Sequence, residues 1–295
     1  MYLRRKILSR MSDAWMLITL AMIILLPLII GVALYFRASG LLQNTGLIHL
    51  LGTSEWLPHE KKFGFVPFIF SSLYVTTLAF AFSAPISFFA AIYLTQFSHG
   101  RMLKIMQPVI DILAGIPSVV YGVWGILVIV PFVSKVVAPA FHFTTSGYSI
   151  LAGGMVLAVM CIPYMLNMLV ESFLTVPQGL KEASFSLGAT AWESVKHAVI
   201  RKSFPGIISS FGLGMAKAFG ETLAVMMVVG NMVKLSLNPL EAGYPLPALI
   251  ANNFGEMMSI PMYDSALMFA AFLLFIIIMA INLIFRYFIY KTQMR

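Results

Sequence analysis

Residues 206–233 have the sequence GIISSFGLGMAKAFGETLAVMMVVGNMV, which is mostly apolar or small. The stretch is long enough to cross a bilayer, which takes about 20 residues. Its charged residues are Lys217 and Glu221, and their spacing of four predicts that they share one face of a helix. A Lys near the centre of a bilayer costs roughly 2.5–3.5 kcal/mol, and a carboxylate is also costly. Such groups persist where they pair, face water or contact a polar molecule in transit, so the stretch indicates a transport protein.

The composition is that of an integral membrane protein. Of the 295 residues, 60% are hydrophobic and 10% are charged, whereas soluble domains carry about 25% charged residues. The net charge of +8 does not indicate nucleic-acid binding, because the basic residues gather at the ends of apolar runs. Cys161 is the only cysteine, and no GxxxxGK[ST] motif occurs. A disulfide framework and a P-loop ATP site in this chain are therefore excluded.

Six apolar runs predict six transmembrane helices, near residues 14–36, 67–95, 106–134, 149–170, 206–233 and 263–288. The first run is too long for the apolar core of a signal peptide, which takes roughly 7–15 residues. Prolines within or near the spans predict kinks, at Pro85, Pro108, Pro117 and Pro163.

The positions of Lys and Arg predict the orientation of the chain. Most of these 19 residues precede the first span, follow the last, or join spans two to three and four to five. Both termini are therefore expected in the cytoplasm. The outer segments are then 38–66, with Trp56 placed as an interfacial anchor, and the proline-rich 234–262. The second is expected to form a structured cap or a short re-entrant piece around LPALIANNF, with a plain loop as the alternative.

The largest inner segment, 171–205, predicts two short helices at the membrane surface. Pro177 is suited to start the first helix and Gly188 to end it. Thr190 then caps the second helix, with Glu193 at the third position as in a capping box. We interpret this unit as an amphipathic docking element, with a helix resting on lipid as the alternative.

The same segment resembles the EAA loop of type I ABC importer permeases, in which a coupling helix fits a cleft on a cytoplasmic ATPase. Two further stretches are similar to permeases of phosphate-specific importers, in particular their C subunits. The matching residues are Glu182-Ala183-Ser184 followed by Gly188 and Pro205-Gly206, then ILAGIPSVVYG at 112–122 and AFGETLAV at 218–225, with FGFVP at 63–67.

The resemblance implies a division of the chain and a set of partners. Residues 1–66 form a transmembrane helix and periplasmic loop, 67–290 the permease core with coupling loop 171–205, and 291–295 a tail. A second homologous permease, a cytoplasmic ATPase dimer and an extracytoplasmic phosphate-binding protein complete the transporter in the inner membrane. This chain binds no cofactor, and ATP and Mg²⁺ belong to the ATPase.

The resemblance also assigns roles to residues. Coupling to the ATPase falls to Glu182, Ala183, Ser184, Gly188 and Thr190. The substrate path is expected to include Lys217, Gly220, Glu221, Thr222, Ser118 and Tyr121. The chain departs from the family pattern at Ser184, at Ile200-Arg201, where Leu-Pro is frequent, and at Lys217, where Arg is usual. Lys keeps the charge but lacks the planar fork that grips an oxyanion in two places.

Several alternatives remain from the sequence. Lys217 and Glu221 either line the path or form an ion pair that fixes helix packing. Asp111, expected near the cytoplasmic end of span three, is either an interfacial residue with water or a basic partner, or part of a gate. The chain as a whole is a phosphate permease, an ABC permease for another oxyanion, or a proton-coupled secondary transporter using Glu221. A membrane-embedded enzyme is disfavoured because no catalytic constellation appears.

Overall fold

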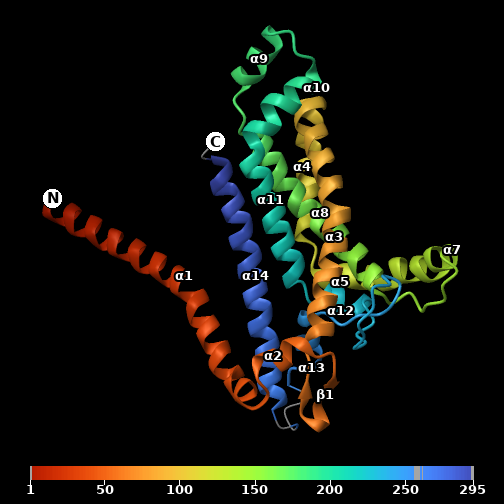
Figure 1. Cartoon of the computed structure of the whole chain (residues 1–295). Helices are drawn as coiled ribbons and strands as arrows, with labels where there is room; N and C mark the ends of the chain where they lie inside the picture. The colour runs from red at the N-terminus through yellow and green to blue at the C-terminus, as the bar shows by residue number, and fades with distance from the viewer. Residues whose placement is uncertain (1, 256–259, 261, 294–295) are drawn as a thin grey trace.

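The computed structural model describes residues 2–255, 260 and 262–293. It confirms an all-α fold, in which four long helices lie side by side along the long axis of the molecule (Figure 1). They are α3 (Val66–Ile92), α8 (Ile150–Leu174), α11 (Ile200–Gly220) and α14 (Tyr263–Gln293). A shorter helix, α4 (Gly100–Gly115), packs against α8.

Within the described residues, five helical segments are long and apolar enough to cross a membrane. They are Ser12–Thr45, Val66–Phe97, Ser118–Ala140, Ile150–Leu174 and Tyr263–Thr292. Four of them confirm predicted spans and extend them by a few residues. The spans expected at 106–134 and 206–233 are each broken by a change of backbone direction. The first break confirms the kink predicted at Pro117, whereas the prediction of one helix over 206–233 is wrong.

The third predicted span breaks at Ile116 and Pro117, which are both extended, and α5 (Ser118–Trp124) begins just after them. Proline lacks an N–H and disfavours helical geometry in the residue before it. The Tyr121 hydroxyl donates to the Leu113 carbonyl at 2.8 Å, and so supplies a donor in place of the N–H that Pro117 lacks. The helical run from α5 to α7 (Ala138–Ala140) then projects sideways from the long helices (Figure 1).

The fifth predicted span breaks at Glu221. Helix α11 ends at Gly220, Glu221 is extended, and the short helix α12 (Leu223–Val228) follows. Gly is a poor helix former, and the Glu221 side chain accepts a hydrogen bond from the Ala224 N–H at 3.4 Å, which favours a new helix start here. Lys217 and Glu221 therefore do not share one helix face, contrary to the prediction from their spacing.

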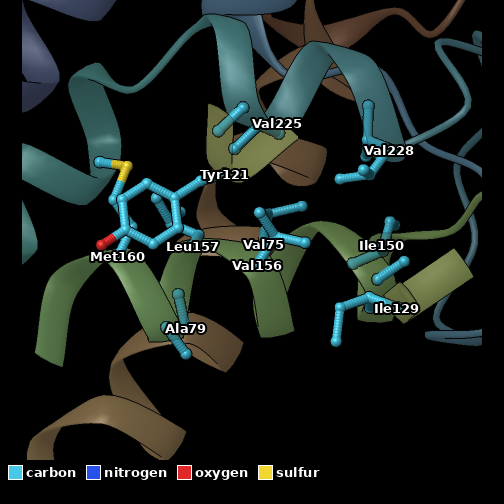
Figure 2. Packing of buried hydrophobic residues seen from close by; sticks show 14 of the residues in the cluster. Val75, Ala79, Tyr121, Ile129, Ile150, Val156, Leu157, Met160, Val225 and Val228 are labelled. Atoms are coloured by element: carbon cyan, nitrogen blue, oxygen red, sulfur yellow. The ribbon is translucent and has the colours of Figure 1, made fainter. Parts of the chain in front are cut away.

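The central core lies where α3 and α8 cross and where α5 and α12 pack on them. Figure 2 shows Val75 and Ala79 of α3 facing Val156 and Leu157 of α8, all of them buried. The crossing is close because α8 has Gly154 at the contact. A Cβ at that position would lie 2.9 Å from the Leu78 Cβ, closer than packed side chains allow.

The outer end of the molecule is a structured cap. It contains α2 (Leu47–Gly52), the hairpin β1–β2 (Trp56–Leu57 and Lys62–Phe63) and α13 (Leu246–Asn253). The hydroxyls of Ser71 and Ser72 on α3 accept hydrogen bonds from the N–H groups of Tyr244 and Leu246. Within the described residues, the outer segment 234–262 is therefore a cap with a buried helix. Residues 256–259 and 261 of the predicted segment lie outside the described part of the chain.

Trp56 belongs to this cap. Its ring packs edge-on against Phe63, Phe65, Phe68 and Tyr263, with ring centroids 4.8–5.9 Å apart. Such aromatic contacts add about 0.5–1.5 kcal/mol per pair beyond area burial. The aromatic cluster ties the hairpin to the outer ends of α3 and α14.

The first helix, α1 (Tyr2–Thr45), joins the body through its second half. Tyr35 contacts Phe272 of α14, with ring centroids 5.9 Å apart, and Arg37 lies 3.8 Å from Asp264. The first half diverges from the body, so its apolar surface is exposed in the single chain (Figure 1).

Candidate functional site

The inner segment folds as its local signals predict. Pro177 precedes α9 (Gln178–Ser186), and Gly188 follows that helix with a left-handed φ of 83°. Thr190 and Glu193 form the predicted capping box at the start of α10 (Ala191–Ser194). The Thr190 N–H donates to Glu193 Oε2 at 2.8 Å, and the Glu193 N–H donates to Thr190 Oγ1 at 3.4 Å. The backbone and hydroxyl of Thr190 lower the pKa of the Glu193 carboxyl.

This segment carries exposed apolar side chains at the end of the molecule away from the cap. Leu187 is 90% exposed, and Phe185 and Trp192 are about half exposed. Between α9 and the start of α11 lies an open cavity of about 820 Å³, lined by Leu180, Ala183, Leu187 and other residues. Apolar patches rimmed by polar groups are typical of protein interaction sites, so this surface fits the predicted docking element.

A hydrogen bond joins the two short helices of this segment. The Ser184 hydroxyl donates to the Ser194 hydroxyl at 2.6 Å. From Ala191 the chain stays helical through α10, a π-helical turn (Val195–Val199) and α11 to Gly220. The helical run therefore continues through Ile200 and Arg201, where the family pattern often has Leu-Pro. Ser184 thus connects α9 to the same helical run that carries Lys217.

Lys217 lies in the last turn of α11 and is half-buried. Its Nζ is 4.4 Å from the centre of the Tyr164 ring on α8. Such cation–π contacts contribute about 0.5–2 kcal/mol, with the larger value where water is excluded. Ion pairs among the described residues join Arg37 to Asp264, Lys62 to Glu55 and Glu60, and Lys234 to Glu241. The ion pair between Lys217 and Glu221 that the sequence left open is thus not formed in this conformation.

The other predicted path residues lie at the two helix breaks. Gly220 is exposed, and a Cβ there would meet nothing nearer than an Ile278 methyl at 4.0 Å. Glu221 and Thr222, which are half-buried, form the link to α12, and the Glu221 side chain also lines a very small cavity against α3. Ser118, also half-buried, begins α5 after the other break.

Tyr121 lies in the central core, as Figure 2 shows. Its ring is buried beside Met160, and its hydroxyl is bonded to the Leu113 carbonyl. In this conformation Tyr121 therefore supports the break between α4 and α5. Its proposed place along the path stays a prediction.

A polar cluster joins α4 to α8 through Asp111, which the sequence singled out, and two amides, Gln107 and Asn167, which sequence reasoning missed. Gln107 Nε2 donates to Asn167 Oδ1 at 2.8 Å, and Asn167 Nδ2 donates to Asp111 Oδ1 at 2.7 Å. Asn167 and Tyr164 are three residues apart on α8 and therefore lie on neighbouring parts of one face. The sequence signal for this cluster was the presence of two amides and an acid inside apolar runs. Their pairing could not be predicted, because it depends on how α4 crosses α8.

A bundle of apolar helices with a capped two-helix segment at one end and charges at a helix break defines the class: a permease with the type I ABC importer fold. One similar solved structure is the MetNI methionine ABC transporter in an inward-facing conformation. It has a TM-score of 0.60 at 19% identity, and the match covers 77% of this chain and 95% of that chain. An amino acid ABC transporter gives a TM-score of 0.52 at 16% identity, covering 77% and 93%.

Residues 83–293 match the family described as binding-protein-dependent transport system inner membrane component, and the chain belongs to that family. Similar relatives include the phosphate transport system permease protein PstC of Xylella fastidiosa, 35% identical over 92% of this chain and 88% of that protein. The probable ABC transporter permease protein YqgH of Bacillus subtilis is 35% identical over 82% of this chain and 78% of that protein. A probable PstC of Methanocaldococcus jannaschii is 32% identical over 98% and 96%.

Proposed function

We propose that this chain is a permease subunit of an ATP-driven importer that moves inorganic phosphate across the cytoplasmic membrane by alternating access. The observation that carries the proposal is the 35% identity over 92% of the chain to a protein named as a phosphate transport permease. The segments that the sequence singled out, 112–122 and 218–225, form the two helix breaks at Pro117 and Glu221.

The partners follow from this class of transporter. A cytoplasmic ATPase dimer, which holds ATP and Mg²⁺, docks on α9 and the exposed side chains around it. A second homologous permease completes the path, and an extracytoplasmic binding protein delivers phosphate to the outer cap. The end of α14 lies toward the end of the molecule that carries α9 (Figure 1), which supports a cytoplasmic C-terminus, and the positions of Lys and Arg support the same side for the N-terminus.

The path residues act on an anion that still carries O–H groups at neutral pH. Lys217 offsets the anion's charge as a point cation, as lysines do at other phosphate sites. Glu221 accepts a hydrogen bond from a phosphate O–H, which fully deprotonated sulfate lacks. Gly220 leaves room for close approach, and Thr222 and Ser118 add hydroxyls at the breaks.

The test is uptake by the complete complex in vesicles, with the partner permease, the ATPase and the binding protein present. We expect labelled phosphate to accumulate only with hydrolysable ATP on the ATPase side. Uptake driven by a pH gradient without the ATPase would instead establish the proton-coupled alternative. Excess sulfate should leave phosphate uptake unchanged. Competition by sulfate at equal concentration would favour the second candidate, a permease for another oxyanion. The observation behind this candidate is Lys217, which stands where the family usually has Arg.

A further inference from the structure

Asp111 places an exposed carboxylate on α4, beside exposed apolar residues. Pro108, three residues earlier on the same face, is exposed, and the following Ile112 is 69% exposed. Lys104 is the last cation before this stretch. At 1.5 Å per residue, Asp111 lies about 10 Å further along the helix. With Lys104 at the membrane surface, that distance places the carboxylate inside a hydrocarbon layer about 30 Å thick.

The carboxylate is held in place on one side only. Asp111 Oδ1 accepts the hydrogen bond from Asn167, and Asn167 is itself held by Gln107. Asp111 belongs to none of the ion pairs or other side-chain hydrogen bonds found within residues 12–255 and 262–292. A fixed acid with an unused oxygen is thus presented at the surface of the single chain.

Its depth limits what covers this face. Lipid tails are a poor neighbour, because a carboxylate in hydrocarbon is costly, up to roughly 2.5–3.5 kcal/mol for an Asp at the centre of a membrane helix. A water-soluble ATPase or binding protein does not reach about 10 Å into the bilayer. Intramembrane acids pair with a basic group or face a polar cavity. On the surface of a single chain, either of these requires a second membrane-embedded chain to cover this face.

We propose that Asp111 faces the second permease subunit across the translocation path and binds a Lys or Arg side chain of that subunit. The apolar residues beside it, Pro108 and Ile112, form the rest of this contact. The inference rests on the proposed function only in requiring a second permease, and it holds whichever anion is carried. Gln107 and Asn167 are positioning residues, because they fix the carboxylate toward the partner.

Labelling in the assembled complex tests the location of Asp111. Replacing the only cysteine, Cys161→Ala, gives a background in which Asp111→Cys is the sole thiol. A photoreactive maleimide on residue 111 should cross-link to the second permease, identified by mass spectrometry of the adduct. Adducts with lipid or with the ATPase instead would overturn the proposal. The unmodified chain is the control, because Cys161 is buried and should not take up the reagent.

Two substitutions test the charge. Asp111→Asn keeps an oxygen for the Asn167 donor but removes the charge, whereas Asp111→Leu removes both. We expect both variants to lower uptake at least tenfold with the complex still recoverable, and the Asp111→Asn complex to dissociate at a lower salt concentration. Normal uptake and unchanged salt resistance for Asp111→Asn would mean that the acid only supports Asn167. Because cross-linking needs no transport, a wrong substrate assignment would leave its result unchanged.

Discussion

The hydroxyls of Ser184 and Ser194 lie 2.6 Å apart and join α9 to α10. Ser184 occupies the third place of the Glu-Ala-Ser triplet, where the EAA loop has Ala. Ser194 lies in the helical run that begins at Ala191 and ends at Gly220, three residues after Lys217. A direct hydrogen bond therefore connects α9 to the helical run that carries the proposed substrate residue, and we expect it to transmit a movement of α9.

Removing this bond should weaken coupling. A typical hydrogen bond contributes about 1 kcal/mol, roughly a fivefold change in an equilibrium. We expect Ser184→Ala to lower phosphate uptake per ATP hydrolysed by a few fold while the complex still assembles. Ser186→Ala is the matched control, because that exposed hydroxyl bonds only to the Glu182 carbonyl within α9. Equal behaviour of the two variants would show that the Ser184 bond does not contribute to coupling.

Gly188 should resist replacement for a conformational reason. Its φ of 83° is left-handed, and nothing lies within 4 Å of a Cβ built on it. Gly188→Ala should therefore cost about 1–2 kcal/mol from backbone strain alone. Gly188→Asn should cost less, because Asn tolerates this conformation. We expect the ATPase activity stimulated by the binding protein to fall from the unchanged chain to Gly188→Asn and further to Gly188→Ala. An equal loss of activity in the two variants would argue against strain as the cause.

Lys217 is expected to act through its charge. Lys217→Met should abolish phosphate uptake while the complex is recovered intact. Lys217→Arg keeps a cation that also stacks on aromatic rings and should retain measurable uptake. Tyr164→Phe keeps the ring beneath the ammonium and serves as the control for the contact with α8. Full uptake by Lys217→Met would assign the residue to helix packing.

Glu221 combines a structural and a chemical role that one substitution separates. Glu221→Gln keeps an oxygen to accept the Ala224 N–H, so α12 should form normally. Glu221→Leu removes that acceptor, and losing such a cap should lower the stability of α12 by about 0.5–2 kcal/mol. We expect Glu221→Gln to assemble but to discriminate phosphate from sulfate less well. Discrimination equal to that of the unchanged chain would remove the hydrogen-bond role of the carboxylate.

The capping box gives the coupling segment a defined response to acid. Because the hydrogen bonds from Thr190 depress the pKa of Glu193, its stabilisation is fully present above the ordinary Glu pKa of about 4.3. That stabilisation is lost only as the pH falls through the lower folded value. The fluorescence of Trp192 can be isolated by subtracting the spectrum of a Trp192→Phe variant. We expect it to stay constant from about pH 8 to 5 and to change below about pH 4. Glu193→Gln should remove this transition.

The sequence predicted the local structure of segment 171–205 almost completely, because its signals are local. Pro177, Gly188 and the pair Thr190–Glu193 each act on their own backbone within a few residues, and each behaves as expected. The breaks at Pro117 and Glu221 were predicted less well. Pro117 indicated a kink, but the size of the turn depends on the Tyr121 bond to Leu113 and on packing against α8 and α12.

By itself the sequence determined that this protein is a membrane-embedded transporter component. A run of apolar residues makes insertion favourable, and helix caps act within one turn of chain. The tertiary structure decided the surroundings of each intramembrane charge. It turned Lys217 toward Tyr164, moved Glu221 out of α11, and joined Asp111 to Asn167. Those relationships depend on how helices distant in sequence cross, and that is set by the packing of many side chains together.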